Sequence, residues 1–151
     1  MIITSGDILE SKCEVLVNPV NCMGVSGAGL AMKFRGKFPS AIEQYRKHCK
    51  ENKVMPGSVL WFRPCERPWI WIACFATKNH WKDKSRLCDI EHGVRALSWD
   101  VVFRGVRSVA IPALGCGLGG LQWDDVKPVM INGLSSLTCN VVLYEPKGKQ
   151  A

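Results

Sequence analysis

Short apolar runs rich in β-branched residues alternate with helical patterns along the 151-residue chain. Each run ends in polar, glycine or proline residues, as expected for buried strands. The predicted strands cover residues 15–18, 58–62, 70–75, 106–112 and 141–144. Strands that alternate with helices form a largely parallel sheet with helices on both faces. The sequence therefore predicts an α/β fold.

Four segments between the strands are predicted to be helices. The first runs from Leu30 to Phe38, and the second begins at Pro39, a residue favoured in the first helical turn. Residues 89–103 carry one apolar stripe, and the fourth helix begins at Trp123, which two acids follow. The stripe consists of Ile90, Val94, Leu97 and Val101.

Length and composition fit one domain. A hydrophobic fraction of 47% is enough to fill a single core. We expect the domain to cover residues 1–146 and a loose tail to cover residues 147–151. No apolar run reaches the roughly 20 residues that span a bilayer, and the N-terminus lacks a signal-peptide pattern. The expected location is cytoplasmic, without a membrane partner.

Eight cysteines invite a disulfide or zinc interpretation, but the chain has no C-x-x-C pair and no clustered histidines. We therefore expect mostly buried, reduced thiols, and we expect no metal and no cofactor. Cys116 lies between two glycines, and a catalytic thiolate there would need a histidine base. The sequence places no histidine beside it, so packing is its favoured role.

The 20 Lys and Arg residues exceed the 13 Asp and Glu residues, which gives a formal net charge of +7. This excess favours polyanionic partners, although solubility alone also explains it. Part of the excess is local. The charged and aromatic members of one short stretch are Lys78, His80, Trp81, Lys82, Lys84 and Arg86. Such a stretch suits single-stranded nucleic acid, and a solvated loop is the equally open alternative.

Two glycine-rich stretches follow predicted strands. The first covers residues 21–29, and the second covers residues 115–120. In a parallel sheet, ligands bind in the crevice beyond the carboxyl ends of the strands. Glycine lets backbone N–H groups come close to phosphate oxygens, so two such loops side by side suit a diphosphate. Each loop taken alone is also explained as a simple turn.

Two common nucleotide sites do not fit these loops. The G-x-G-x-x-G pattern, with an acid about 20 residues later, is not met cleanly. No glycine is followed by Lys-Ser or Lys-Thr in the frame of a P-loop. What remains is a nucleotide diphosphate that is held mainly by the backbone.

At these residues the sequence resembles the macrodomain family, and the resemblance covers nearly the whole chain. The shared motifs, in family order and spacing, are Gly6-Asp7-Ile8, Leu16-Val17-Asn18-Pro19-Val20-Asn21, the loop at residues 24–29 and Pro112-Ala113-Leu114-Gly115-Cys116-Gly117-Leu118-Gly119. The resemblance implies a three-layer α/β/α sandwich with a mixed, largely parallel central sheet. It also implies that the chain binds ADP-ribose.

The resemblance further implies where ADP-ribose lies. Asp7 and Ile8 would lie at the adenine and Asn21 at the distal ribose, although an asparagine after a strand is often only a turn former. The first loop would cover the distal ribose and diphosphate, and the second would complete the phosphate cradle. The expected contacts are Asp7, Ile8, Pro19, Val20, Asn21, Gly27, Gly29, Leu30, Thr77, Gly115, Cys116, Gly117, Leu118 and Gly119.

Within the family, the chain is similar to the branch of DNA ADP-ribosyl glycohydrolase antitoxins and terminal ADP-ribose protein glycohydrolases. This similarity is carried by Ala76-Thr77-Lys78-Asn79-His80-Trp81, Lys84-Ser85-Arg86 and Ile90. It implies that Lys78 is catalytic. The protein-directed enzymes also use an aspartate in the second loop, where this chain has Gly119, and this difference favours DNA as the substrate. The expected DNA contacts are His80, Trp81, Lys82, Lys84 and Arg86.

The leading hypothesis is a hydrolase that removes ADP-ribose from thymidine in single-stranded DNA, as in a toxin–antitoxin system. The partners would be ADP-ribosylated single-stranded DNA and a cognate ADP-ribosyltransferase toxin. An antitoxin of this kind is expected to carry a second domain that restrains its toxin, and nothing after Pro146 is long enough to do so. A hydrolase of protein-linked ADP-ribose or of ADP-ribose 1″-phosphate, and a reader without chemistry, are the alternatives.

Lys78 has two chemical routes in such a hydrolase. As a free amine it attacks the anomeric carbon or traps the ring-opened sugar as a Schiff base, and as an ammonium ion it gives a proton. The carboxylate pair of most glycosidases is not evident. Asp124 and Asp125 are more simply explained as residues at the start of a helix.

Overall fold

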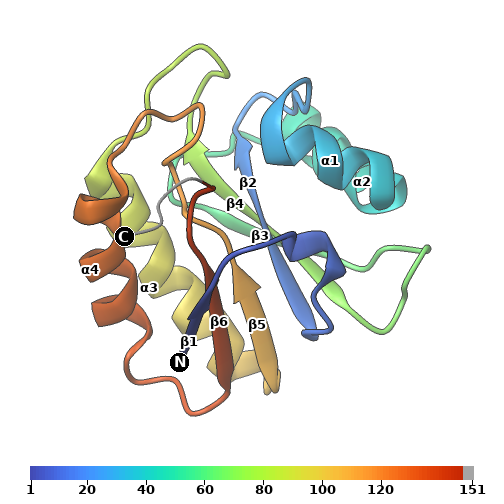
Figure 1. Cartoon of the computed structure of the whole chain (residues 1–151). Helices are drawn as coiled ribbons and strands as arrows, with labels where there is room; N and C mark the ends of the chain where they lie inside the picture. The colour runs from blue at the N-terminus through green and yellow to red at the C-terminus, as the bar shows by residue number, and fades with distance from the viewer. Residues whose placement is uncertain (148–151) are drawn as a thin grey trace.

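The computed structural model describes residues 1–147, which form a six-stranded sheet with helices on both faces (Figure 1). The strands are β1 (Ile2–Thr4), β2 (Val15–Asn21), β3 (Val59–Phe62), β4 (Trp71–Lys78), β5 (Ser108–Ile111) and β6 (Asn140–Tyr144). The helices are α1 (Gly29–Lys37), α2 (Pro39–Glu51), α3 (Leu87–Arg104) and α4 (Trp123–Leu134), with a short 3-10 helix, η1 (Ile8–Glu10), after β1.

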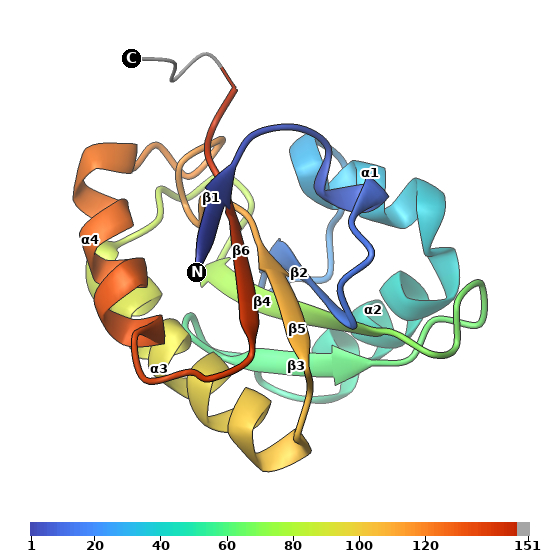
Figure 2. The same ribbon diagram turned by 60° about the horizontal axis from the view of Figure 1, so that its bottom comes forward.

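The sheet has the strand order β1-β6-β5-β2-β4-β3, and each neighbouring pair is parallel except β3 with β4. Helices α1 and α2 cover one face, and α3 and α4 cover the other (Figure 1, Figure 2). Each face has its own buried apolar cluster. The predicted three-layer sandwich with a mixed, largely parallel sheet is confirmed. Because the parallel strands run the same way, their carboxyl ends meet at one edge.

The four predicted helices are confirmed, and a bend at Phe38 separates the first two. A residue before proline is kept out of the helical region, and Phe38 has φ −127° and ψ 59°. Its N–H still donates to Phe34 O (2.8 Å) and closes α1. The bend lets α2 run along the sheet while α1 begins, at Gly29, beside the first glycine-rich loop.

Two strands continue beyond their predicted ends. The last residue of β2 is Asn21 and the last of β4 is Lys78, and these two residues are paired in the sheet. The extension brings both side chains to the edge where the parallel strands end. The sequence did not predict β1, because its residues Ile2 and Ile3 are exposed and form too short an apolar run. Pairing with β6 holds β1 in place.

The expectation that most cysteines are buried is wrong. Cys22 and Cys74 are buried, Cys65 and Cys88 are exposed, and the other four are half-buried, all as free thiols. Cys65 lies in the connection between β3 and β4, and Cys88 lies in the first turn of α3, where neither side chain meets the core. Burial, and to a smaller degree Cys49, raises the pKa of the Cys22 thiol to about 11.

Two predictions about residues within the helices are confirmed. The apolar stripe of α3 is buried, and Asp124 and Asp125 lie in the first turn of α4. No helix among residues 1–147 combines the length and apolar character that a membrane crossing needs. Within the same residues, no group of three or more His, Cys, Asp or Glu side chains could hold a metal ion. Of the expected tail, residues 148–151 lie outside the described residues.

Candidate functional site

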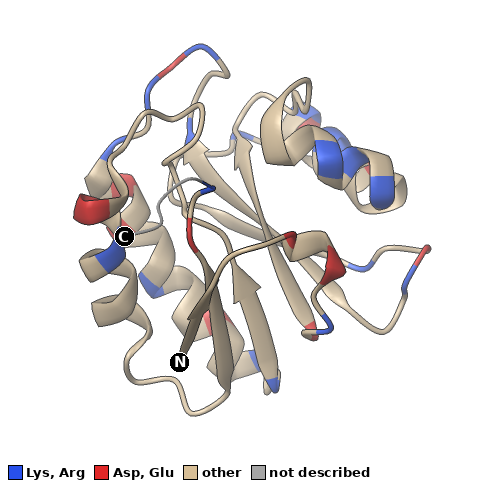
Figure 3. Ribbon diagram, viewed as in Figure 1, with Lys and Arg blue, Asp and Glu red and all other residues tan. Residues whose placement is uncertain are grey.

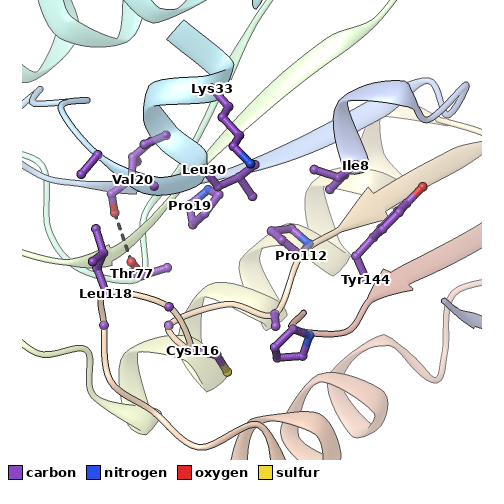
Figure 4. A pocket seen from close by; sticks show the side chains of 18 of the residues that line it. Ile8, Pro19, Val20, Leu30, Lys33, Thr77, Pro112, Cys116, Leu118 and Tyr144 are labelled. Atoms are coloured by element: carbon purple, nitrogen blue, oxygen red, sulfur yellow. Dashed lines mark hydrogen bonds between the residues drawn. The ribbon is translucent and has the colours of Figure 1, made fainter. Parts of the chain in front are cut away.

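A pocket of about 910 Å³ lies at the carboxyl ends of β2, β4, β5 and β6 (Figure 4). Its walls are the turn before η1, the two glycine-rich loops, the start of α1 and the chain after β6. A pocket of this size can hold a nucleotide-sized ligand. Lys78 and every residue expected to contact ADP-ribose line it. The structure thus brings together residues that the sequence keeps more than 100 positions apart.

Several lining residues were not expected. Four of them, Tyr144, Glu145, Pro146 and Lys147, form the last residue of β6 and the chain after it. The rule that ligands bind beyond the carboxyl ends of parallel strands could have found them, because the apolar run of β6 is visible in the sequence. The others are Gly6, Val25, Ala28, Ala31, Lys33, Pro112 and Ala113. Lys33 has no such signal, since it lies inside α1, one turn after the loop.

One end of the pocket is an apolar surface beside a carboxylate. Figure 4 shows Ile8, Pro112 and Tyr144 around this end. Asp7 lines the same end, and its Oδ1 accepts the N–H of Leu9 (3.0 Å), which caps η1. The second carboxylate oxygen is available to accept a hydrogen bond from a ligand. This end can therefore take a flat heterocycle that carries an amino group.

Hydrogen bonds of Asn21 shape the first glycine-rich loop. Its Nδ2 donates to Val25 O (2.8 Å), and its Oδ1 accepts the N–H groups of Met23 (3.0 Å) and Val25 (3.3 Å). The hydroxyl of Tyr45, on α2, donates to the backbone oxygen of Asn21 (2.7 Å). Gly29 ends the loop with a φ of +60°, in the left-handed region that favours glycine. Asn21 is thus a turn former, and its Nδ2 keeps one hydrogen for a ligand.

The second glycine-rich loop is held by its backbone and by close packing. The N–H of Leu121 donates to Gly115 O (2.9 Å), and the N–H of Ser85 donates to Gly119 O (3.0 Å). Gly115 has a φ of +76°, and a Cβ added there would lie 2.8 Å from Leu121 Cδ1. A Cβ at Gly119 would clash with Ser85 Oγ and lie 2.6 Å from Gly115 O. Gly119 therefore has no room for a side chain, and the left-handed backbone disfavours one at Gly115.

The two loops meet across the pocket through Leu118. A Cβ added to Gly29 would lie 3.4 Å from Leu118 Cδ1, which places the loops in van der Waals reach. Backbone N–H groups of both loops can therefore surround one diphosphate. Cys116 lines the pocket, and its half-buried thiol donates to Leu114 O (3.6 Å), in keeping with a packing role.

Lys78 supplies an amine to the pocket. Its side chain is half-buried, next to Asn21 at the end of the paired strands. Burial lowers the pKa of Lys78 below the ordinary value of a lysine; the nearby Lys84 adds to this shift, and Asp83 opposes it. The uncharged amine is therefore more populated here than on an exposed lysine.

The segment after β4, residues 79–86, gathers aromatic and basic side chains beside the pocket. Figure 3 shows its lysine and arginine residues on the loop at the top of the view. Trp81 lines the pocket, is 48% exposed and stacks on His80, with ring centroids 5.2 Å apart and planes at 30°. Lys82 Nζ lies 5.0 Å from the centroid of the Trp81 ring. The other expected DNA contacts, His80, Lys82, Lys84 and Arg86, lie outside the pocket lining.

Comparison with known proteins gives a consistent result. The Macro domain family matches residues 17–130. The chain is 38% identical to the DNA ADP-ribosyl glycohydrolase of Thermus aquaticus over 144 residues, 93% of this chain and 40% of the relative. It is 33% identical to a DNA ADP-ribosyl transferase–DNA ADP-ribosyl glycohydrolase fusion protein of Thermosipho africanus, over 98% of this chain and 42% of the relative. The chain spans less than half the length of these curated relatives.

Solved structures of macrodomains also resemble this chain. The macrodomain of Thermus aquaticus DarG superposes with a TM-score of 0.90 at 37% identity, covering 96% of this chain and 97% of that chain. Thermosipho africanus DarTG in complex with ADP-ribose superposes with a TM-score of 0.89 at 34% identity, covering 97% of this chain and 41% of that chain.

Proposed function

Because the chain belongs to the macrodomain family, we propose that its pocket binds ADP-ribose and that the protein hydrolyses the bond between ADP-ribose and DNA. The observation that carries this proposal is the half-buried Lys78 in the pocket wall, whose pKa is lowered. A protein that only bound ADP-ribose would have no use for such an amine. The activity named for the Thermus aquaticus relative supports DNA as the substrate.

The ligand would span the pocket from η1 to Lys78. The adenine lies at the apolar end with Asp7 and Ile8, and the diphosphate lies between the two glycine-rich loops. This order leaves the distal ribose beside Asn21 and Lys78, at the ends of β2 and β4. Backbone N–H groups then neutralise the diphosphate without a lysine. The anomeric carbon comes within reach of the only amine at that end of the described pocket lining.

The reaction breaks the bond between the anomeric carbon of the distal ribose and the base, with positive charge developing on the sugar ring. As a free amine, Lys78 attacks the anomeric carbon and displaces the base, which leaves with the bonding electron pair. Opening of the sugar ring then turns the adduct into a Schiff base. Water then releases ADP-ribose and returns the amine. As an ammonium ion, it instead gives a proton to the ring oxygen. The lowered pKa of Lys78 supports the amine routes.

The second loop offers no acid to help the leaving group. Gly119 has no side chain, and the contacts with Ser85 and Gly115 leave no space for one. A thymine that leaves through its ring nitrogen needs little help, because the negative charge spreads over two carbonyl groups and is then protonated by water. The packing at Gly119 therefore supports a thymidine-linked substrate over the two-residue reaction of the protein-directed enzymes.

The segment at residues 79–86 would hold the DNA strand outside the pocket. The half-exposed Trp81 offers a ring on which a base can stack, and Lys82, Lys84 and Arg86 suit phosphates. A DNA ADP-ribosyl transferase is the proposed protein partner, since the Thermosipho africanus relative joins both activities in one chain. A cytoplasmic location belongs to the same proposal.

The direct test compares three substrates: a single-stranded oligonucleotide ADP-ribosylated on thymidine, a protein ADP-ribosylated on a carboxylate, and ADP-ribose 1″-phosphate. We expect release of free ADP-ribose from the oligonucleotide, with little release from the other two. Faster release of ADP-ribose from the protein would mean that ADP-ribosylated protein, and not ADP-ribosylated DNA, is the preferred substrate. Tight binding of ADP-ribose with no release from any substrate would make the protein a reader and would end the proposal of catalysis.

A further inference from the structure

Large apolar side chains lie exposed on the outer face of α3. Trp99, Val102 and Phe103 have exposed fractions of 74%, 68% and 84%. They are three and four residues apart along the helix, so they are neighbours on one side of it. Exposed clusters of large apolar side chains are uncommon on monomeric proteins and mark contact surfaces.

Trp99 and Phe103 belong to a longer seam along α3, which consists of His92, Ala96, Trp99 and Phe103. The seam residues are spaced four, three and four positions apart, the spacing by which two α-helices pack lengthwise. His92 is exposed and rests against the turn before β3, where a Cβ added to Gly57 would lie 2.9 Å from its Cδ2. The seam lies on the side of α3 away from its buried stripe.

We propose that this seam binds the same seam of a second copy of the chain, so that two α3 helices pack antiparallel about a twofold axis. A symmetric interface must be complementary to itself. With the axis between Ala96 and Trp99, each Trp99 lies over the small Ala96 of the second copy, and each Phe103 lies against its His92. Large side chains then meet small ones, and rings meet rings, as in well-packed helix pairs.

The charges around the seam favour a protein over a nucleic acid. Arg95 Nη2 is paired with Glu91 Oε1 at 2.8 Å. The guanidinium of Arg104 lies over Trp61 and Trp71, 4.6 and 4.7 Å from the ring centroids, on the side of α3 that faces the sheet. The seam itself contains no lysine or arginine. Phosphate binding depends on such cations, so an apolar protein surface is the better partner.

The size of the seam sets the strength of the dimer. An aromatic side chain buries roughly 150–250 Å², so two Trp99 and two Phe103 side chains bury roughly 600–1,000 Å² together. At the rim, Val102 of one copy falls beside the alkyl stem of Arg95 of the other. This area is below the roughly 1,200–2,000 Å² of stable protein interfaces and in the range of weak, transient ones. We therefore expect a reversible dimer that forms at micromolar concentrations or above.

The dimer leaves both pockets open. Helix α3 begins at Leu87, after the basic segment, and ends at Arg104, before β5 starts at the opposite edge of the sheet. Figure 2 shows the C-terminal half of α3 at the lower edge of the molecule, away from α1. No seam residue is among the described pocket lining, so the dimer and the proposed hydrolase activity can be tested independently of each other.

Sedimentation velocity over a wide range of loading concentrations tests the dimer. We expect the sedimentation coefficient of the wild-type protein to rise with concentration from the monomer toward the dimer. The double variant Trp99→Gln/Phe103→Gln should raise the dissociation constant at least tenfold, and Ala96→Gln should do the same by filling the space under Trp99. Trp69→Gln is the matched control, because Trp69 is equally exposed, at 70%, in the connection between β3 and β4.

The substituted side chains are not buried, so each variant should keep the thermal midpoint and ADP-ribose affinity of the wild type. A wild-type protein that stays monomeric at all concentrations would overturn the proposal. A dimer that survives in both seam variants would also overturn it, because the contact would then lie elsewhere. Loss of the dimer in the Trp69 variant as well would show that any exposed tryptophan supports association, without a specific seam.

Discussion

The two glycine-rich loops enclose the same pocket, yet they are held in different ways. The first depends on hydrogen bonds of polar side chains, since Asn21, its first residue, and Tyr45 on α2 fix its backbone. The second depends on the absence of side chains, because Gly115 and Gly119 pack directly against Ser85 and against each other. The first loop should therefore fail when atoms are removed, and the second should fail when atoms are added.

The largest effect is expected from adding one methyl group to the second loop. Gly115→Ala combines a left-handed backbone, which costs about 1–2 kcal/mol, with overpacking against Leu121, which costs about 1–3 kcal/mol. Chemical denaturation should show a matching loss in the free energy of unfolding, and calorimetry should show weaker ADP-ribose binding. For the free energy of unfolding, Gly117→Ala is the control, because a Cβ there meets nothing within 4 Å. Equal effects of the two variants would contradict this account of the loop.

A smaller effect is expected from removing the side chain of Asn21. Asn21→Ala leaves the N–H groups of Met23 and Val25 without their acceptor, which should cost about 1–3 kcal/mol. Affinity for ADP-ribose, measured by calorimetry, should fall at least tenfold because the loop loses its shape. Asn21→Asp keeps the acceptor for Met23 and Val25 but places a negatively charged oxygen against Val25 O, so it should also lower the affinity. Unchanged affinity in the alanine variant would refute the role of Asn21 as loop former.

Tyr45→Phe tests how much the Tyr45 hydroxyl on α2 contributes to the shape of the first loop. The variant keeps the ring of this fully buried side chain and removes only the hydroxyl, which lies within hydrogen-bond distance of Asn21 O (2.7 Å) and Asn21 Oδ1 (3.2 Å). We expect a loss of about 1 kcal/mol in the free energy of unfolding, measured by chemical denaturation. The loss of ADP-ribose affinity should be smaller than in Asn21→Ala. A larger loss than in that variant would mean that α2 matters to the pocket through packing.

The smallest effect is a shift in pH dependence. Lys84 packs against the second loop, with its Cδ 3.2 Å from a Cβ added to Gly120, and its charge lowers the pKa of Lys78. Lys84→Met keeps most of the packing and removes the charge, so the pKa of Lys78 should rise. If the free amine reacts, the hydrolysis rate rises with pH through this pKa, and the rising limb should move to higher pH. A pH–rate profile that stays in place or moves to lower pH would argue against the amine routes.

Much of the pocket follows from local sequence. Both loops contain glycines directly after apolar strands, and strand order along a parallel sheet brings such loops to one edge. The sequence did not predict that residues 144–146 line the pocket, because Tyr144-Glu145-Pro146 carries no glycine and resembles the end of the domain. The sequence did not predict β1 either, because only its pairing with β6 makes it a strand.

The supports of the loops could not be predicted. Asn21 and Tyr45 are 24 positions apart on different elements, and no residue pattern predicts a hydrogen bond between them. The close approach of Ser85 to Gly119 depends on where residues 79–86 fold back, which is set by tertiary packing. The same holds for the pKa of Lys78, which depends on burial and on its neighbours in space.

The proposed function depends on the amine of Lys78, which performs the chemistry in a pocket built by the rest of the site. Its most direct test measures two properties of Lys78→Ala: affinity for ADP-ribose by calorimetry, and release of ADP-ribose from a thymidine-linked oligonucleotide. We expect an affinity close to that of the wild type and no detectable release. Full release by the variant would contradict the claim and would place the chemistry on another group of the pocket.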